Sequence, residues 1–364
     1  MEIVYYFNDY QVPMYQWQHI HIIDELKIHD CNVTIISPLD YASVDEANDA
    51  LIRYIKKNKT DLFMTPHNEE DLWISTLETI KTLGVPTLLI CFDNLVVPFI
   101  HYKIAPYFDL VWLTSKETKP LFDRRGVNSV FLPYAANPNL ERCEESIDGV
   151  GFVGTPYGSR ANMINALTDS GISVYCHFIR NAEPLNYELK PHSRMSQRQV
   201  ALEFFKFKQG RRVIAGAVTN RFKKAAVLED NEHLHKCTVV PPSELYKVYP
   251  KYSLALSSTA ARNTGILKHP LFIVNLRSFE IPMSGGLQIC QYTDEMAEYF
   301  EDGKEIVFYR TNDELVEKAA FYCSPDQENI RKKMRKAARE SAIAHHTWYK
   351  RFLVVFKLLD IKKI

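Results

Sequence analysis

Short apolar runs alternate with amphipathic stretches along the first 132 residues. Between the runs, apolar residues recur at helical spacing in His19–His29, Val44–Lys57 and Glu70–Leu83. Strands that alternate with helices in this way predict a parallel sheet joined by right-handed crossovers. The expected strands are Ile3–Phe7, Val33–Ser37, Leu62–Thr65, Thr87–Phe92, Leu110–Thr114 and Val130–Leu132.

The alternation stops at Pro133–Asp148, a polar segment without periodicity that we interpret as a linker. It restarts with a strand at Gly149–Val153, and two helices are expected at the end of the chain, over 327–345 and 347–359. Residues 180–235 give no clear pattern. The other expected elements are a helix at Arg160–Ser170 and strands at Val174–Phe178, Thr238–Val240, Leu254–Ser257, Leu271–Leu276, Leu287–Cys290 and Glu305–Tyr309.

The pattern predicts two doubly wound, Rossmann-like α/β domains that face each other across a cleft. We expect an N-terminal domain over 1–140, a C-terminal domain over 141–340 and a terminal helix over 341–364 that crosses back to the N-terminal domain. A length of 364 residues fits two domains of ordinary size.

Composition narrows the class of protein. Apolar residues make up 46% and charged residues 24% of the chain, as in soluble globular proteins, and 44 basic residues balance 44 acidic ones, which gives no attraction to nucleic acid. Seven cysteines without a CxxC pair indicate free thiols in a reducing compartment. No apolar run approaches the roughly 18 residues that span a bilayer, so we expect a cytoplasmic protein.

Basic charge is concentrated at the C-terminus, where residues 327–364 hold 11 basic and 3 acidic side chains. The run IRKKMRKAARE (330–340) is typical of a solvated helix face. The alternative is a peripheral contact with anionic lipid at the inner membrane face, which would suit a lipid-linked acceptor.

The stretch GFVGTPYGSR (151–160) combines a strand, a glycine-containing turn and the start of a helix. Free amides at a helix N-terminus favour an anion, and Gly154 and Gly158 would let a phosphate approach the backbone. Arg160 adds a cation that can bind a diphosphate in bidentate fashion. The stretch lacks the P-loop lysine and the GxGxxG spacing, and an ordinary structural turn remains the alternative.

A second stretch, LRSFEIPMSGG (276–286), predicts a short helix after the expected strand Leu271–Leu276. Glu280 in its first turn would lie at the carboxyl edge of the sheet and could accept hydrogen bonds from the hydroxyls of a ribose. Arg277 could pair with Glu280 or contact phosphate. The alternative is that Glu280 only complements the helix dipole.

Candidates for a general base follow the strands of the first domain. Asp93 in CFDN is our first choice and His67 in TPHNEED our second, and Asn8 and Asp9 also lie at a strand end. For Asp93 and His67 the alternative is capping of the next helix. The aromatic segment Tyr10–Trp17 could stack on a sugar ring or simply be packed.

Five motifs resemble, in order and spacing, the C-terminal domain of CgeB-like (spore maturation protein-like) glycosyltransferases, a branch of the group-1 glycosyltransferases with the GT-B fold. The segments FDN (92–94) and LPYAANP (132–138) match more loosely in the first half. The motifs are FVGTPYGSR (152–160), PSELYKVYPKYSLALS (242–257), RSFEIPMSGG (277–286), YTDEMAEYFEDGKEIVFY (292–309) and HHTWYKRF (345–352).

The resemblance implies transfer of a sugar from a nucleotide-diphosphate donor, such as a UDP- or GDP-sugar, to a saccharide or glycolipid. Catalysis would rest on domain closure and on stabilisation of the departing diphosphate by Arg160 and backbone amides. Neither a metal nor a cofactor is expected, and His233, His235 and Cys237 are not expected to form a metal site. The predicted donor-binding residues are Gly154, Thr155, Gly158, Arg160, Arg277, Ser278, Phe279 and Glu280.

The chain departs from the family pattern at one position. The first glutamate of the paired-glutamate motif should precede Glu280 by eight residues, where this sequence has Phe272, and position 288 is Gln. Retention of anomeric configuration therefore cannot be inherited from the motif. The departure also leaves two alternatives open: a non-catalytic sugar-nucleotide or glycan-binding protein, and a sugar-nucleotide epimerase.

Overall fold

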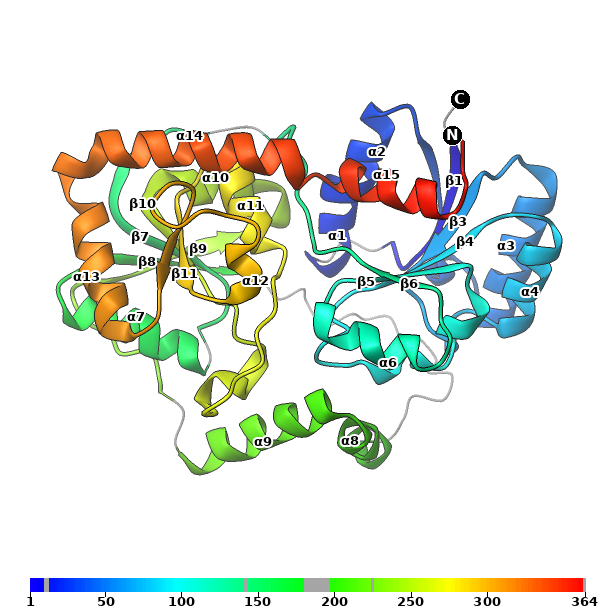
Figure 1. The fold of residues 1–364 in the computed structure, drawn as a ribbon, viewed down its shortest axis with the longest axis horizontal. Helices are drawn as coiled ribbons and strands as arrows, with labels where there is room; N and C mark the ends of the chain where they lie inside the picture. The colour runs from blue at the N-terminus through cyan, green and yellow to red at the C-terminus, as the bar shows by residue number, and fades with distance from the viewer. Residues whose placement is uncertain (10–12, 141–142, 157, 180–196, 224–225, 363–364) are drawn as a thin grey trace. The chain divides into compact units, whose positions relative to one another are not determined.

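The computed structural model describes the chain except residues 10–12, 141–142, 157, 180–196, 224–225 and 363–364 (Figure 1). The described residues form two compact units. Unit 1 consists of Met1–Pro133, the described part of Ala182–Arg211, and Trp348–Ile364; unit 2 consists of Tyr134–Asn181 and Arg212–Thr347, again where described. These divisions differ by a few residues from the expected boundaries at 140 and 341. The inclusion of residues 197–211 in unit 1 was not expected from the sequence.

Unit 1 contains a parallel six-stranded sheet in the order β2-β1-β3-β4-β5-β6. All six strands predicted in this part of the sequence are confirmed. They are β1 (Glu2–Tyr6), β2 (Asn32–Ile36), β3 (Leu62–Thr65), β4 (Thr87–Cys91), β5 (Leu110–Leu113) and β6 (Ser129–Phe131).

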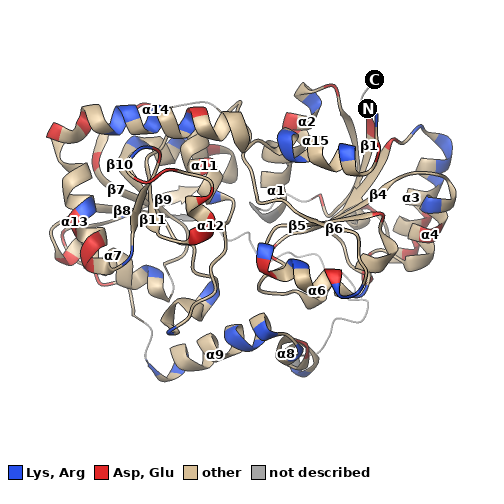
Figure 2. Ribbon diagram, in the orientation of Figure 1, with Lys and Arg blue, Asp and Glu red and all other residues tan. Residues whose placement is uncertain are grey.

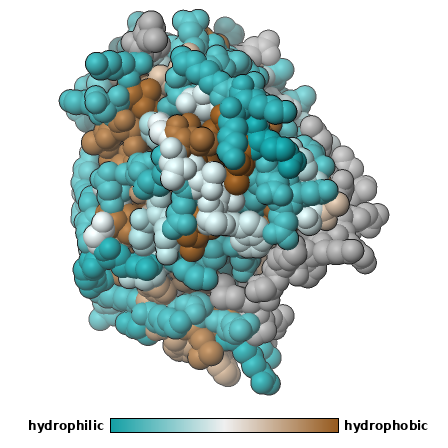
Figure 3. Space-filling model, turned by 90° about the vertical axis from the view of Figure 1, so that its right-hand side faces the viewer, coloured by the Kyte–Doolittle hydropathy of each residue, from teal (hydrophilic) through white to brown (hydrophobic). Residues whose placement is uncertain are grey.

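Helices cover both faces of this sheet. On one face, α3 (Val44–Lys57), α4 (Ile74–Thr82) and α6 (Lys119–Asp123) bury apolar side chains against it. On the other face, the ring of Trp112 in β5 packs against Trp348 and Phe352 at centroid distances of 5.6 and 5.4 Å. Those two residues belong to α15 (Trp348–Leu358), which also packs on the π-helical turn η1 (His19–Ile23) and on α2 (Asp24–Ile28). The surface on the side of α3 and α4 is mainly hydrophilic, with hydrophobic side chains in small patches (Figure 3).

Unit 2 contains a second parallel six-stranded sheet, in the order β12-β11-β10-β7-β8-β9. On one face, α7 (Ser159–Asp169) and α13 (Asn312–Cys323) bury a core, and α10 (Leu245–Val248) and α11 (Arg277–Ser284) pack on the other. The predicted fold class, two doubly wound α/β domains, is confirmed. The strands are β7 (Ile147–Val153), β8 (Val174–Ile179), β9 (Leu234–Val240), β10 (Tyr252–Ser257), β11 (Gln288–Gln291) and β12 (Val307–Tyr309).

The remaining elements are short or peripheral. The α-helices are α1 (Pro13–Gln18), α5 (Phe99–Tyr102), α8 (Gln197–Lys206), α9 (Lys208–Phe222), α12 (Asp294–Ala297) and α14 (Glu328–His345). The 3₁₀ turns are η2 (Pro38–Asp40), η3 (Ala105–Tyr107), η4 (Lys116–Thr118), η5 (Pro242–Glu244), η6 (Tyr249–Lys251), η7 (Arg262–Ile266) and η8 (Pro325–Gln327). None of the described helices is both long and apolar enough to traverse a bilayer.

The predicted strand Leu271–Leu276 is wrong. β10 already has β7 and β11 as its two neighbours, so no lateral position in the sheet is left beside it for this segment. The segment instead forms an antiparallel bridge between Phe272 and Ala260, in the loop that follows β10. Glu280 therefore follows a loop rather than a parallel strand, although its predicted position in the first turn of a helix, α11, is right.

The basic run of α14 is only partly solvated. The Lys and Arg residues of this helix lie between Arg331 and Arg339, and its C-terminal end has none (Figure 2). Arg331 and Arg335 are buried, however, and their Nη2 atoms lie 2.7 and 2.9 Å from the carboxylate oxygens of Glu145. Removing one member of a buried ion pair costs about 3–5 kcal/mol. Part of this run therefore stabilises unit 2, and the exposed part is reduced to residues such as Lys332, Lys333 and Lys336.

Candidate functional site

Each sheet has one topological switch point, where consecutive crossovers leave the first strand on opposite sides. In unit 1 it lies between β1 and β3, and in unit 2 it lies between β7 and β10. Ligands of open α/β sheets bind outside the carboxyl ends of the strands at such points. Candidate residues from the sequence follow β1, β3 and β7, the strands that border the two switch points.

In unit 2, the turn after β7 requires glycine at two positions. Gly154 has φ of 142°, and a Cβ there would lie 3.4 Å from Nη2 of Arg277. Gly158 has φ of 59°, precedes α7, and would bring a Cβ to 3.4 Å from Oδ1 of Asn263. L-residues rarely adopt such angles, and the missing Cβ atoms leave the backbone open to close approach. Tyr157 lies outside the described residues.

The two stretches predicted to bind the donor, 151–160 and 276–286, meet at this turn. The guanidinium of Arg277 lies over Gly154, although the two residues are far apart in the chain. Asn275 holds this arrangement, because its Oδ1 accepts a hydrogen bond of 3.0 Å from the backbone N–H of Arg277. Its Nδ2 donates a bond of 3.0 Å to the carbonyl of Ser258, in the loop after β10. The loops after β7 and β10 therefore place a cation at the switch point.

Three buried polar atoms in the loop after β10 and at the start of α11 have no hydrogen-bond partner within the described part of the chain. They are Nε of Arg277, Oγ of Ser278 and Oγ1 of Thr259. Buried polar groups are nearly always paired in folded proteins, so unpaired ones indicate positions where a ligand or water binds. Thr259 was not predicted from the sequence.

Arg160 and Thr155 lie on the outer side of the turn. Arg160 is half-buried, and its Nη1 donates a hydrogen bond of 3.2 Å to the carbonyl of Thr155, whose side chain is exposed. This hydrogen bond joins the guanidinium to the turn that precedes α7. The guanidinium remains beside the N-terminus of α7, where backbone N–H groups favour an anion. A small pocket of about 190 Å³ lies next to this helix start, lined in part by Ser159 and Gly265.

Glu280 and Phe279 are both buried in α11. The hydroxyl of Tyr249 lies 3.3 Å from Oε2 of Glu280 and donates to it. Burial raises the pKa of Tyr249, the Glu280 carboxylate raises it further, and Arg277 lowers it. The ring of Phe279 packs among Tyr299, Phe300 and His346. Phe279 therefore fixes α11 in the core rather than presenting its side chain at the turn.

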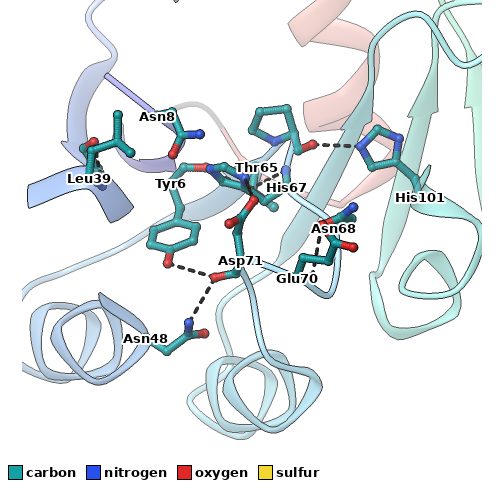
Figure 4. A network of polar contacts seen from close by, with 12 residues as sticks. Tyr6, Asn8, Leu39, Asn48, Thr65, His67, Asn68, Glu70, Asp71 and His101 are labelled. Atoms are coloured by element: carbon teal, nitrogen blue, oxygen red, sulfur yellow. Dashed lines mark hydrogen bonds and ion pairs between the residues drawn. The ribbon is translucent and has the colours of Figure 1, made fainter. Parts of the chain in front are cut away.

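In unit 1, His67 follows β3 and is held by several hydrogen bonds (Figure 4). Its Nδ1 lies 2.9 Å from Oδ2 of Asp71, and its backbone N–H donates a bond of 3.0 Å to Oγ1 of Thr65. The hydroxyl of Tyr6 and the amide of Asn48 each donate to the backbone carbonyl of Asp71, both at 3.0 Å. The His67–Asp71 pair is therefore fixed on the end of β3.

This pair has the geometry of a proton acceptor. Asp71 accepts the Nδ1 proton, which leaves the lone pair on Nε2. Nε2 of His67 is buried and has no hydrogen-bond partner in the part of the chain that is described. An imidazole oriented in this way can remove a proton from a hydroxyl that comes within hydrogen-bond distance. Asp71 was missed from the sequence, and its signal was the four-residue spacing from His67 in TPHNEED.

Comparison with known proteins identifies the class of enzyme. A family model described as "Glycosyl transferase-like" matches residues 198–356. A glycosyltransferase from Rickettsia africae ESF-5 and Anabaena Alr3699/HepE in complex with UDP and glucose each superimpose with a TM-score of 0.59 at 12% identity, over 99% of both chains. An alpha-glucosyltransferase in complex with UDP-glucose and DNA gives a TM-score of 0.60 at 11% identity, again over 99% of both chains. No curated protein sequence matches the chain.

The chain is a glycosyltransferase of the GT-B fold. The activity is assigned from the family model, and the solved structures show the fold. Neither comparison identifies the residues that act in this glycosyltransferase, so their roles rest on the geometry of the two switch points.

The other base candidates of the glycosyltransferase differ from His67 in burial and partners. Asp93 is exposed and has φ of 52° in a turn after β4. The next helix, α5, begins six residues later with Pro98 as its N-cap, so Asp93 does not cap it. Asp9 lies 2.7 Å from Nε2 of His19, and Asn8 lies 3.4 Å from the hydroxyl of Tyr15.

The aromatic segment predicted near the N-terminus is described only from residue 13 onward. Trp17 packs against Phe92 and Trp348 at centroid distances of 5.0 and 5.9 Å. This contact agrees with the packed alternative for Trp17. Residues 10–12 of the segment lie outside the described residues. Among those described, no group of three or more His, Cys, Asp or Glu side chains could hold a metal ion.

Proposed function

We propose that this glycosyltransferase transfers a hexose or related sugar from a UDP- or GDP-type donor to a saccharide or glycolipid, and that it belongs to the CgeB-like branch. The single observation that carries the proposal is the guanidinium of Arg277 above Gly154, at the switch point of unit 2. The bound UDP and glucose of the Anabaena protein and the UDP-glucose of the alpha-glucosyltransferase support a donor of this class.

In this proposal the diphosphate binds against the turn after β7. Gly154 and Gly158 admit it to the backbone, and Arg277 and Arg160 supply charge-assisted hydrogen bonds, which are about twice as strong as neutral ones. The carboxylate of Glu280 accepts hydrogen bonds from the ribose. Thr155 and Ser278 line the same turn and helix start, and Ser278 offers a buried hydroxyl that has no partner among the described residues.

Departure of the nucleoside diphosphate is the step that the cations would favour. Negative charge develops on the diphosphate as the sugar bond breaks, and donors already aimed at that position lower the barrier. The proposed mechanism uses the arginines and backbone amides for this purpose, without a metal. The nucleotide sugar is consumed as a substrate, and no cofactor is part of the proposal.

The acceptor side of the proposal assigns the general base to His67, with Asp93 second. This reverses the order predicted from the sequence, because His67 is oriented by a carboxylate and has a buried nitrogen without a partner among the described residues, whereas Asp93 is exposed. Asp71 acts as a positioning residue. It keeps the proton on Nδ1 and the lone pair on Nε2.

Thermal denaturation with added nucleotides tests the proposal. UDP or GDP should raise the melting temperature of the wild-type protein, whereas ATP and NAD should not, since binding to the folded state alone stabilises it. Arg277→Ala should abolish the shift. Arg221→Ala, which removes an exposed arginine of α9 in unit 2, should retain it. A normal shift in Arg277→Ala, or no shift with any nucleotide diphosphate in the wild type, would refute the donor site.

A further inference from the structure

Unit 1 contains a pocket that begins two residues after His67 and that the proposed donor site does not use. It measures about 630 Å³ and lies between the loop 69–73, helix α5 and helix α8. This volume is within the range of about 300–1,000 Å³ that is typical of small-molecule sites. All of its lining residues belong to unit 1.

The indole of Trp73 in this pocket is oriented by a hydrogen bond, because its Nε1 donates to Oδ1 of Asp45 at 3.0 Å. The backbone N–H of Trp73 donates to Oδ1 of Asn48, also at 3.0 Å, and holds the main chain of the loop. A ring oriented before binding loses little conformational entropy when a ligand stacks on it. Rigid aromatic faces combined with a few polar groups form the usual lining of a small-molecule site. The apolar C–H face of a sugar ring fits such a surface.

Helix α8 forms the opposite wall and is attached through aromatic contacts. Phe204 packs edge-on against Phe99 at 5.1 Å, and Phe207, the residue directly after α8, packs edge-on against Tyr102 at 5.4 Å. These contacts place two charged residues of α8, Glu203 and Lys206, in the lining of the pocket. The pocket therefore depends on a segment that the sequence pattern assigned to the other domain.

The charges that line the pocket balance one another. Lys103 lies 3.5 Å from Oε1 of Glu69, and Lys206 lies 2.5 Å from Glu203. With Glu70 and Arg125 included, the lining contains three acidic and three basic residues. A phosphorylated or carboxylated ligand would require an excess of cations. The lining instead suits a neutral molecule with many hydroxyl groups.

Glu69 supplies a specific acceptor for such a hydroxyl. Its Oε2 is buried and has no hydrogen-bond partner within the described part of the chain. An unsatisfied buried carboxylate oxygen costs free energy that a sugar hydroxyl would recover. Glu69 also lies two residues after His67 in the same loop.

The pocket and His67 share one rigid framework. Nε2 of His101, in α5, lies 2.7 Å from the carbonyl of Pro66 and donates to it. This bond joins the wall formed by α5 to the residue directly before His67 (Figure 4). A ligand held in the pocket is therefore anchored to the same loop as the proposed base.

We propose that this pocket, which we call the Trp73 pocket, binds the acceptor and that the acceptor is a neutral saccharide. The proposal rests on the proposed function and extends it by naming the substrate class of the acceptor side. Trp73 stacks on a sugar ring and Glu69 accepts one of its hydroxyls, while the reacting hydroxyl points toward His67.

Saturation-transfer NMR tests binding without requiring turnover. The probes are neutral saccharides (maltose, cellobiose, lactose and maltotriose) together with glucuronic acid and glucose 1-phosphate. We expect a signal from at least one neutral saccharide with the wild-type protein and its loss in Trp73→Ala. Trp73→Phe, which keeps a ring, and Tyr107→Ala, which removes a partly exposed ring of unit 1 that does not line the pocket, should retain the signal.

Kinetics then separate a binding role from a structural one. With UDP-glucose or GDP-glucose as donor, Trp73→Ala should raise the KM for the saccharide at least about tenfold, equal to ~1.4 kcal/mol, with kcat and the Kd for UDP unchanged. The Trp73 pocket is not the acceptor site if Trp73→Ala leaves binding and KM unchanged. The same conclusion follows if the charged probes bind better than the neutral ones, or if no neutral saccharide binds. Saccharide binding by a protein that binds no nucleotide diphosphate would instead overturn the donor site and leave the pocket standing.

Discussion

The two sheets carry different chemistry at equivalent positions. In unit 2 the residue after the first strand is Gly154, with a positive φ and an arginine above it. In unit 1 the first strand is followed by Asn8 and Asp9, and its neighbour β3 is followed by His67, so polar and titratable side chains stand where unit 2 has a bare backbone. The first arrangement admits and neutralises an anion, and the second can hold and exchange a proton.

This difference is independent of strand order. Counted within each unit, the sheet of unit 2 runs 3-2-1-4-5-6, whereas that of unit 1 runs 2-1-3-4-5-6. Both orders produce a switch point beside the first strand, and in both units the candidate residues border it. The scaffold therefore sets where a ligand can bind, and the residues at the strand ends set what it can be. If this division of roles is right, mutations in the two units should affect different measurable quantities.

Replacement of the base should give the largest effect. We expect His67→Ala to lower the rate of sugar transfer by about 10³-fold, because general base catalysis contributes about 10²–10⁴-fold. The Kd for UDP should not change, since the diphosphate site belongs to unit 2. Steady-state release of UDP in the presence of acceptor, together with titration calorimetry, measures both quantities.

Asp71→Asn is the matched variant for this prediction. The substituted amide would keep the size of the side chain but favour the wrong tautomer of His67, so a smaller loss of rate is expected. A pH–rate profile would show the change in proton acceptance. If His67→Ala or Asp71→Asn weakened UDP binding and left the rate of transfer at saturating donor unchanged, unit 1 would contribute to donor binding rather than to proton transfer. The two units would then not have separate roles.

The second prediction concerns the stability of unit 1 in acid. Burial lowers the pKa of His101 to about 4; the hydrogen bond to Pro66 opposes this shift and the nearby His67 adds to it. Below an ordinary pKa of about 6.5, the unfolded chain takes up a proton that the folded chain does not accept until about pH 4. The free energy of unfolding should therefore fall as the pH decreases through this window, by roughly 3 kcal/mol from this group alone.

His101→Gln, which keeps a donor for the Pro66 carbonyl, isolates this contribution. Urea unfolding at pH 7 and pH 4.5 should show a smaller loss of stability in the variant than in the wild type. An equal loss in both proteins would mean that the pKa of His101 is not lowered in the folded chain relative to the unfolded one. Because unit 1 holds His101 beside His67, the acid sensitivity should appear in the unfolding of that unit.

The third prediction tests the bare backbone of unit 2. Gly154→Ala adds a Cβ at a φ of 142° and 3.4 Å from Arg277, so we expect about tenfold weaker UDP binding and a loss of stability of about 1–3 kcal/mol. Gly303→Ala is the control, because Gly303 also has a positive φ of 72° but no atom of the described residues lies within 4 Å of the added Cβ. Equal UDP binding by the two variants would show that a Cβ at Gly154 does not obstruct the diphosphate.

The sequence predicted the repeating elements far better than the arrangement of the side chains. Burial on both faces of a parallel sheet leaves continuous apolar runs, and those runs predicted all six strands of unit 1. Leu271–Leu276 has the same apolar pattern, yet it is not a strand because both sides of β10 are occupied, which only the assembled sheet reveals.

In the candidate site, too, the residues with a local sequence pattern could be predicted, and those brought together by long-range packing could not. Gly154, Gly158 and Arg277 could be found because glycine and arginine beside a strand–helix turn have a local signature. The Trp73 pocket could not be found, since it needs α8 to pack against α5 through rings that have no pattern in the sequence. Long-range packing also explains Arg331, which is buried against Glu145 although Lys332 and Lys333, which follow it in the sequence, are exposed.

The smallest expected effect concerns the exposed lysines of α14. Lys332 and Lys336 pair with Glu328 and Glu340 one turn away, which offsets part of their charge. Attraction to an anionic surface adds about 1 kcal/mol per unpaired basic residue and is screened by salt. We therefore expect sedimentation with phosphatidylserine vesicles to be weak. Reversal of Lys332, Lys333 and Lys336 to glutamate should change it only a few-fold, at low salt alone. Salt-resistant binding that this reversal abolishes would instead make α14 a membrane anchor, and unit 2 would then have a surface role in addition to holding the donor.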